Sequence, residues 1–221
     1  NMLTIDHINK NIPQLQLTDT VGKSLHLIND YRVTHLPVVL EKKFLGLVSE
    51  EDLLDQEDEQ LTLDGLQKYF IQDAILNDIH FLIAVEFSLK HDSSLVPVVN
   101  QQREYFGAIT TSDLLKIMGN FAGAYEIGGI IVLQMERPQF SISEISRLVE
   151  NNDCHILHLN TQTDHSTGIF TVTLHVNHRE IAPLVASFER HEYDVLYSYG
   201  SEKFENEIDS NYNHLMKYLD I

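Results

Sequence analysis

One short pattern occurs twice in the sequence, and this duplication limits the possible folds more than any other feature. GLVSEEDLL begins at Gly46, and GAITTSDLL begins at Gly107, 61 residues later. Both copies follow the order glycine, two apolar residues, serine or threonine, two variable residues, aspartate and two leucines. An internal repeat of this kind indicates a duplicated supersecondary unit, so both copies are expected to fold in the same way.

The residues around each copy complete the unit. RVTHLPVV precedes the first copy and SSLVPVV precedes the second, and each predicts a short buried strand that contains a proline. Apolar residues at helical spacing lie before each strand, within 21–28 and 82–89. The predicted strands span residues 36–40, 44–48, 95–99 and 105–110. Each unit therefore reads as helix, strand, strand and helix.

Ser49–x–x–Asp52 and Thr110–x–x–Asp113 predict where the second helix of each unit begins. In a capping box, the hydroxyl accepts from a backbone N–H and the carboxylate reaches back to the first residue. Such a cap stabilises a helix by about 1 kcal/mol. Capping alone does not explain why the strand, the proline and the glycine recur around it.

Two units of this pattern resemble a tandem pair of CBS domains over residues 2–121. The resemblance implies two pseudo-symmetric α+β units, about 2–60 and 66–121, packed through their sheets around two clefts. In this family the clefts commonly take adenosine-containing ligands. Members often open each unit with Met-Thr, and the corresponding places here read Ile8-Asn9 and Ala74-Ile75.

The resemblance also assigns site residues. Ribose-binding carboxylates correspond to Asp52 and Asp113, and the hydroxyls near the ribose or phosphate correspond to Ser49 and Thr110. A carboxylate accepts two hydrogen bonds from a vicinal diol, and a helix N-terminus offers N–H groups to a phosphate. In this resemblance the backbone around Leu36-Pro37 and Val96-Pro97 would contact the adenine, with Thr34 and Ser94 as polar neighbours.

Few basic residues lie near the expected clefts, and the candidates are Arg32, His35 and Arg103. A triphosphate needs more positive charge, and Glu50 and Glu51 would repel it, so AMP or S-adenosylmethionine is favoured over ATP. No cofactor is expected to be required. Helix capping without any ligand remains the alternative.

Residues 129–200 carry a different pattern, after a linker at 122–128. Four predicted strands and two predicted helices follow the order β-α-β-β-α-β, which is the ferredoxin-like arrangement. The strands span 130–135, 155–161, 170–176 and 194–199, and the helices are centred on apolar residues within 142–149 and 181–188. We expect Pro183 in the first turn of its helix, where its missing N–H costs no hydrogen bond.

This third part resembles an ACT domain, a fold that commonly pairs side by side and often binds an amino acid at the interface. The ligand loop of that family often carries a glycine, whereas residues 136–140 have none, so a dimerisation module is the alternative. The whole arrangement resembles acetoin-utilisation-type CBS proteins. Residues 201–221 form an acidic tail, with a short terminal helix predicted within 212–219.

The bulk composition narrows the class of partner. The formal net charge of −18 repels nucleic-acid backbones and anionic lipids, so we expect neither nucleic-acid nor membrane binding. No apolar run approaches the roughly 20 residues that cross a bilayer. The N-terminus has no signal-peptide pattern, and the single cysteine, Cys154, suits a reducing cytoplasm.

Catalytic and metal-binding patterns are missing from the sequence. Gly-x-Ser-x-Gly, the P-loop and Gly-x-Gly-x-x-Gly are all absent, so we expect no enzyme. Alternation along a strand would place Cys154 and His158 on one face, and His158 could meet His175 on a neighbouring strand. No zinc spacing is present among the 12 histidines, so we expect no metal site. The acidic stretch 50–64 is expected to be a solvated helix face, with a weak divalent-metal site as the alternative.

These observations predict a cytoplasmic regulatory sensor. Its CBS clefts would bind an adenosyl small molecule. The ACT-like domain would form a homodimer or bind a second metabolite. Ligand binding would then be transmitted to a dimer interface or to a surface for a protein partner. Two alternatives stay open: a ligand-free dimerising interaction protein with vestigial clefts, and a divalent-metal sensor.

Overall fold

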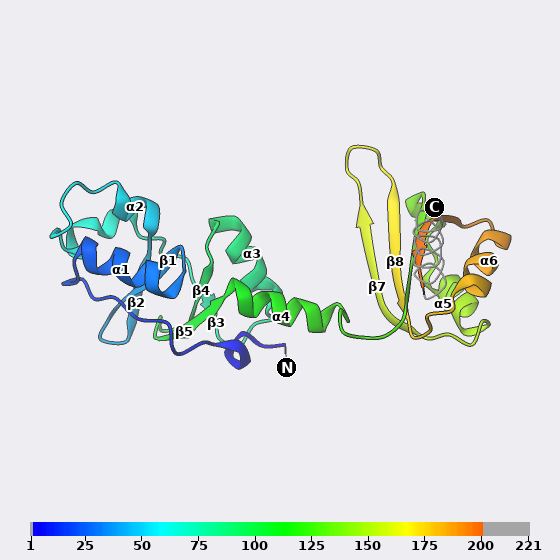
Figure 1. The fold of residues 1–221 in the computed structure, drawn as a ribbon, viewed down its shortest axis with the longest axis horizontal. Coiled ribbons are helices and arrows are strands. Elements are labelled where there is room, and N and C mark those ends of the chain that lie inside the picture. Colours follow the sequence, from blue (N-terminus) through cyan, green and yellow to red (C-terminus); the bar gives the residue numbers. More distant parts are fainter. Residues whose placement is uncertain (1, 201–221) are drawn as a thin grey trace, which may run out of the picture. The chain divides into compact units, whose positions relative to one another are not determined.

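The computed structural model describes residues 2–200, and the chain divides into two units, Asn1–Met118 and Gly119–Ile221 (Figure 1). The first unit holds both repeats, and the second holds the C-terminal pattern. Among the described residues, no helix is long and apolar enough to cross a membrane. The terminal helix predicted within 212–219 lies outside the described residues.

Both repeats have the predicted order of helix, strand, strand and helix. The first contains α1 (Val21–Tyr31), β1 (His35–Leu40), β2 (Lys43–Ser49) and α2 (Glu50–Leu54). The second contains β3 (Ile75–Leu76), α3 (Leu82–His91), β4 (Leu95–Val99), β5 (Tyr105–Thr110) and α4 (Thr111–Phe121). The short 3-10 turns are η1 (Thr4–His7) and η2 (Leu63–Tyr69).

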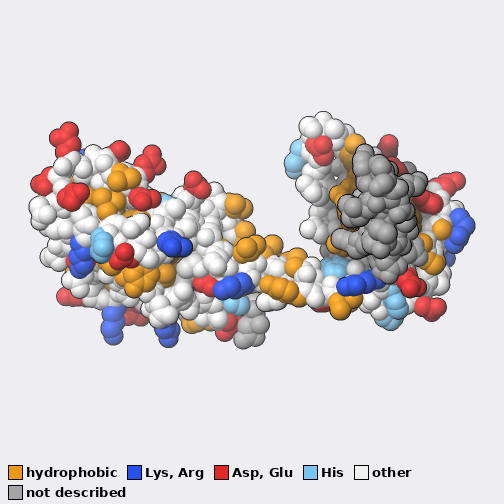
Figure 2. All heavy atoms as spheres, in the orientation of Figure 1, with side chains coloured by type: hydrophobic (Ala, Val, Ile, Leu, Met, Phe, Trp, Pro, Cys, Tyr) orange, Lys and Arg blue, Asp and Glu red, His pale blue; other side chains and the backbone are white. Residues whose placement is uncertain are grey.

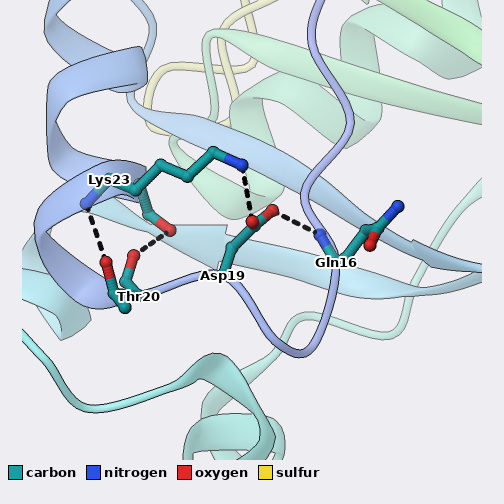
Figure 3. Close-up of polar contacts among 5 residues, drawn as sticks. Gln16, Asp19, Thr20 and Lys23 are labelled. Carbon is teal, nitrogen blue, oxygen red and sulfur yellow. Dashed lines mark hydrogen bonds and ion pairs between the residues drawn. The ribbon is translucent and has the colours of Figure 1, made fainter.

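The residues before α1 show why this helix begins at Val21 (Figure 3). Thr20 Oγ1 accepts a hydrogen bond of 3.2 Å from the backbone N–H of Lys23. The Lys23 ammonium reaches back to Asp19 Oδ1 at 2.6 Å, and the other Asp19 oxygen accepts from the Gln16 N–H at 2.8 Å. The threonine satisfies one of the N–H groups that a helix leaves free in its first turn, and the aspartate holds the approach to it.

The two repeats are joined where the segment entering one repeat crosses the second strand of the other. Asn9 pairs with Ala108 in β5, and Ile71 pairs with Leu47 in β2. The Asn9 N–H donates to the Ala108 carbonyl at 2.8 Å, while Leu47 and Ile71 exchange two bonds of 2.9 Å. Ile71 is therefore the equivalent of Asn9 in the second repeat. The prediction that Ala74-Ile75 corresponds to Ile8-Asn9 was wrong.

A glycine stands in each copy of the pattern because the crossing segment leaves no room for a side chain. A Cβ atom on Gly107 would lie 2.3 Å from Ile8 Cγ2, and one on Gly46 would lie 2.6 Å from Phe70 Cβ. Gly107 also has a φ of 144°, which residues with a side chain rarely adopt. The repeated glycine is thus a requirement of the joint between the repeats.

Each repeat also contributes apolar side chains to the core of the other. The core built around the first repeat includes Leu95 and Ala108 from the second. The core built around the second repeat includes Phe44 and Leu47 from the first. Removing these surfaces from water stabilises the two repeats as one folding unit.

The acidic stretch 50–64 differs from the single helix face that was predicted. α2 ends at Leu54, and the chain then runs irregularly to η2, with most of its carboxylates exposed. Figure 2 shows Asp and Glu side chains projecting from the part of the first unit around α2. Within residues 2–200, no three His, Cys, Asp or Glu side chains gather in an arrangement that could hold a metal ion.

The second unit has the predicted ferredoxin-like order, with both helices on one face of the sheet (Figure 1). Its elements are β6 (Gly129–Met135), η3 (Arg137–Gln139), α5 (Ile142–Glu150), β7 (Ile156–Thr163), β8 (Phe170–Val176), α6 (Ala182–Arg190) and β9 (Asp194–Tyr199). The antiparallel sheet has the order β7-β8-β6-β9. Pro183 lies in the first turn of α6, as predicted.

Candidate functional site: two hydroxyl–carboxylate pairs

Ser49 ends β2 and caps α2. Its Oγ accepts a hydrogen bond of 3.0 Å from the backbone N–H of Asp52 and donates one of 2.6 Å to Asp52 Oδ2. Both side chains are partly exposed. Within residues 2–200, Asp52 Oδ1 has no hydrogen-bond or ion-pair partner, so this oxygen remains available as an acceptor.

Thr110 and Asp113 repeat this geometry where β5 passes into α4. Thr110 Oγ1 accepts from the Asp113 N–H at 3.1 Å and donates to Asp113 Oδ2 at 2.7 Å. The exposed Lys116 ammonium lies 3.8 Å from Asp113 Oδ1. A capping box has two hydrogen bonds, and only one of them is present in each copy. The hydroxyl accepts from the aspartate N–H as predicted, but the carboxylate accepts from the hydroxyl and not from the backbone N–H of the capping residue.

Thr34 and Ser94, expected as polar neighbours of an adenine, bond each other across the two repeats. The Thr34 N–H donates to Ser94 Oγ at 2.8 Å, and the Ser94 N–H donates to Thr34 Oγ1 at 2.9 Å. Their carbonyls accept from the first residues of the second helices, Glu50 at 2.8 Å and Thr111 at 3.0 Å. This reciprocal pair connects the starts of α2 and α4. No local pattern in the sequence predicts the bonds between Thr34 and Ser94.

The proline-containing strands lie in the interior. Leu36 and Val96 have no exposed surface, and Pro37 and Pro97 are buried. The Pro37 carbonyl also accepts a bond of 2.8 Å from the Leu15 N–H. The side chains of these four residues serve the core, so any ligand contact from these strands would come from the backbone.

His35 marks a difference between the two repeats, because its equivalent in the second repeat is Leu95. It lies opposite Ser49 in the β1–β2 register and is 6% exposed. Its Nδ1 is 2.7 Å from Thr34 Oγ1. Burial lowers the pKa of His35; the charges of Asp52 and Asp92 oppose this fall, and that of His91 adds to it. The first repeat therefore places beside its carboxylate an imidazole whose burial disfavours the charged form.

Arg103 was a candidate for holding a phosphate, but its guanidinium has structural partners. Its Nη2 donates to the Gln72 carbonyl at 2.9 Å and to the Phe44 carbonyl at 3.4 Å. The guanidinium carbon also lies 5.5 Å from the centre of the Phe44 ring. Arg32 ends α1 in a left-handed conformation, with a φ of 52°. Among the described residues, neither arginine forms a hydrogen bond or an ion pair with a hydroxyl–carboxylate pair.

The histidines of the second unit meet in part as predicted. His158 lies opposite His175, with ring centres 5.9 Å apart. His158 Nε2 is 3.4 Å from Glu126 Oε1. The prediction that Cys154 and His158 share one face was wrong, because Cys154 lies in the core before β7 begins and the strand register shifts between Ile156 and His158.

Comparison with known proteins gives a family match within the first repeat. Residues 5–59 match the CBS domain family model. A curated relative, a homoserine O-acetyltransferase from Methanobrevibacter ruminantium, is 27% identical over 124 residues. The match covers 52% of this chain but only 24% of the relative, so the chain spans about a quarter of that enzyme.

Several solved structures are similar to about half of the chain. A CBS domain pair/ACT domain protein from Thermotoga maritima is 24% identical, with a TM-score of 0.49 and coverage of 54% of this chain and 98% of the other. A protein assigned to acetoin utilization (AcuB) from Vibrio cholerae is 24% identical, with a TM-score of 0.46 and coverage of 56% and 95%. A CBS domain pair in complex with 5-methylthioadenosine and S-adenosyl-L-methionine is 19% identical, with a TM-score of 0.45 and coverage of 55% and 99%.

The first repeat is thus a CBS domain, and the second repeats its fold and its hydroxyl–carboxylate geometry. The whole fold is a tandem CBS-domain pair followed by a C-terminal ferredoxin-like domain. CBS domains are regulatory ligand-binding modules.

Proposed function

We propose that the chain is a regulatory sensor that binds an adenosine-containing ligand beside Asp52, Asp113 or both. The observation that carries this proposal is the repeated pair of a hydroxyl and a carboxylate at the start of a helix. Asp52 Oδ1 is unpartnered within residues 2–200, and Asp113 Oδ1 has only the distant Lys116. A carboxylate held in this way accepts bonds from the two hydroxyls of a ribose.

The charges near each pair favour different adenosyl compounds. Glu50 and Glu51 lie beside Ser49, so the first cleft disfavours phosphates and suits the positively charged S-adenosylmethionine. Lys116 lies beside Asp113, so the second cleft better accepts the monophosphate of AMP. Among residues 2–200, Lys116 is the only lysine or arginine that pairs with either carboxylate, whereas a triphosphate needs several basic groups, which disfavours ATP.

The reciprocal bonds of Thr34 and Ser94 offer a route for signalling. They connect the starts of α2 and α4, so a ligand that moves one helix start affects the other repeat. A shift in repeat packing requires different ligand affinities for two states of the pair. The second unit would carry the signal to a homodimer or a partner surface. We propose that the chain itself binds and does not transform its ligand, because both hydroxyls already bond helix-starting aspartates.

A thermal-shift screen of the full chain with adenosine, AMP, ATP and S-adenosylmethionine tests the proposal. A ligand at 100 times its dissociation constant stabilises a protein by about 2.7 kcal/mol. We expect a shift with AMP or S-adenosylmethionine that the double variant Asp52→Asn, Asp113→Asn abolishes. Asp55→Asn with Glu86→Gln, two exposed acids elsewhere on the same unit, is the control of equal charge change.

The alternative of a ligand-free interaction protein also has an observation in its favour. Thr34, Ser94 and both hydroxyl–carboxylate pairs satisfy most of their hydrogen bonds without any ligand. The absence of a shift with every adenosyl compound, together with a dimer detected by mass measurement, would favour this second function.

A further inference from the structure

The sheet of the second unit has two faces, and α5 and α6 pack on the same one. Ile131, Leu133 and Met135 of β6 share an apolar core with these helices. Side chains alternate along a strand, so Ile130 and Val132 point to the opposite face, which we call the open face. An antiparallel sheet often leaves one face to water, and such a face is usually polar.

The open face is polar only over its β7–β8 half. The strand register places six polar residues there: His158, Asn160, Gln162, Thr171, Thr173 and His175. The linker before β6 lies beside this half, because Glu126 Oε1 is 3.4 Å from His158 Nε2 and a Cβ on Gly123 would lie 2.2 Å from the same nitrogen. This half is therefore suited to water and to the linker.

The β6–β9 half of the open face is apolar. Ile130 pairs with Tyr199 and Val132 pairs with Tyr197, so each pair lies on this face. Ile130 is 37% exposed and Tyr197 is 45% exposed, and Val132 lies between Tyr197 and Thr173 of the flanking strands. We call Ile130, Val132 and Tyr197 the apolar strip.

The apolar strip has the width of one helix. Neighbouring strands lie about 4.8 Å apart, and a helix with its side chains is about 10 Å across. The sheet of a second copy would also cover the polar β7–β8 half, and polar groups buried without partners cost stability. A single amphipathic helix fits the strip better than a second sheet does.

The chain contains such a segment directly after the strip. β9 lies at the edge of the sheet beside β6, and the chain leaves it at Gly200. In the residues that follow, apolar side chains recur at helical spacing: Tyr212, Leu215, Met216 and Leu219. A helix of this length is marginal by itself in water, so its apolar stripe needs a surface to pack on.

The connection is long enough for this stripe to return over the sheet. Residues 201–211 can extend to about 36 Å. A strand of seven residues, such as β6, is about 23 Å long. The stripe can therefore reach any part of the apolar strip from Gly200.

We propose that residues 201–221 pack the stripe of Tyr212, Leu215, Met216 and Leu219 onto the apolar strip of the same protomer. The segment would form a third layer of the second unit, on the side of the sheet away from α5 and α6. It would also keep the strip from associating with other chains. This inference goes beyond the sensor function and does not depend on an adenosyl ligand.

A nitroxide spin label on the full chain tests this contact by NMR. The label is attached at His214→Cys, off the apolar stripe, in a Cys154→Ala background that leaves one thiol. We expect it to broaden the amide signals of Val132 and Gln134 more than that of Ile181. Ile181 is the control for distance from the chain exit, because it lies beside Gly200 in the core under the helices. Equal broadening at these positions, or none, would overturn the proposal.

Variants of the stripe separate packing from mere proximity. Leu215→Asp with Leu219→Asp should abolish the selective broadening, because carboxylates are poorly accommodated against an apolar surface. Asn211→Asp with Asn213→Asp adds the same charge off the stripe and should retain it. Loss in both double variants, or in neither, would contradict the proposal. Tyr197→Thr, which removes a ring from the strip, should weaken the broadening independently.

A mixture of two preparations identifies the protomer that supplies the segment. One is isotope-labelled without the nitroxide, and the other carries the nitroxide without isotopes. We expect no selective broadening of Val132 in this mixture, whereas its appearance would mean that a second copy supplies the segment and would overturn the proposal. The Asp52→Asn, Asp113→Asn variant should keep the contact within one protomer, so failure of the sensor proposal and failure of this one are distinguishable.

Discussion

The first and second repeats place the same hydroxyl–carboxylate pair at the same point of the fold, with Oγ···Oδ2 distances of 2.6 and 2.7 Å. Both also have a glycine beneath a crossing segment. The groups around this common frame differ: His35 is replaced by Leu95, and the acidic Glu50 is replaced by Thr111. The duplication therefore keeps the joint between the repeats while changing the charge beside each hydroxyl–carboxylate pair.

The glycine at the joint should show the largest effect of any substitution in the comparison. Gly107→Ala combines an overpacked contact with a strained φ and should destabilise the fold by about 3 kcal/mol or more. Gly46→Ala introduces the overpacked contact without the strained φ, and should lower the free energy of unfolding by about 2 kcal/mol. Urea unfolding measures both.

Gly65→Ala is the matched control for these substitutions, because a Cβ there would meet only Leu61 Cδ1, at 3.7 Å. It should change the free energy of unfolding by less than about 1 kcal/mol. If Gly107→Ala were as stable as this control, the crossing of the repeats would not constrain the pattern.

His35 should give a smaller, pH-dependent difference between the repeats. Its folded pKa lies below its ordinary value of 6.5, so the unfolded chain takes up the proton first as the pH falls. The stabilising contribution is complete above pH 6.5 and declines below it, at up to about 1.4 kcal/mol per pH unit.

His35→Leu, which copies Leu95 of the second repeat, should remove this part of the pH dependence. Urea unfolding at pH 7.5 and pH 5.5 measures it for the parent and the variant. His165→Leu, in an exposed turn, is the control for loss of one histidine. An unchanged slope in His35→Leu would mean that this imidazole is not kept uncharged by the fold.

Tyr105→Phe should have the smallest effect. Tyr105 takes the place of Phe44 in the second repeat, and the two rings stack with centres 6.1 Å apart. The Tyr105 hydroxyl is buried without a hydrogen-bond partner among residues 2–200. Its removal should therefore leave stability unchanged or raise it by up to about 1 kcal/mol in thermal or urea unfolding. A clear loss would indicate a partner for this hydroxyl, such as a buried water.

The sequence predicted the fold well because apolar periodicity and helix-start signals are local. β4, β5, β8 and β9 begin and end where the pattern placed them. Ser49 and Thr110 also hydrogen-bond their aspartates. Each pair is three positions apart on the first turn of a helix, which brings the two side chains together.

Features that depend on contacts between distant segments were missed or misplaced. The crossing that places Ile71 on Leu47 has no local signal. The register shift after Ile156 broke the simple alternation that was used to place His158. The bonds between Thr34 and Ser94 and the apolar strip across β6 and β9 arise from segments that only the tertiary fold brings together.

Calorimetric titration of the Asp52→Asn and Asp113→Asn single variants with S-adenosylmethionine and AMP tests the central claim most directly. Each substitution keeps the side-chain shape but removes the charge that strengthens the bonds to a ribose. We expect Asp113→Asn to weaken AMP binding at least about tenfold and Asp52→Asn to weaken S-adenosylmethionine binding to a similar degree. Parent-like affinity for both compounds in both variants would contradict the account.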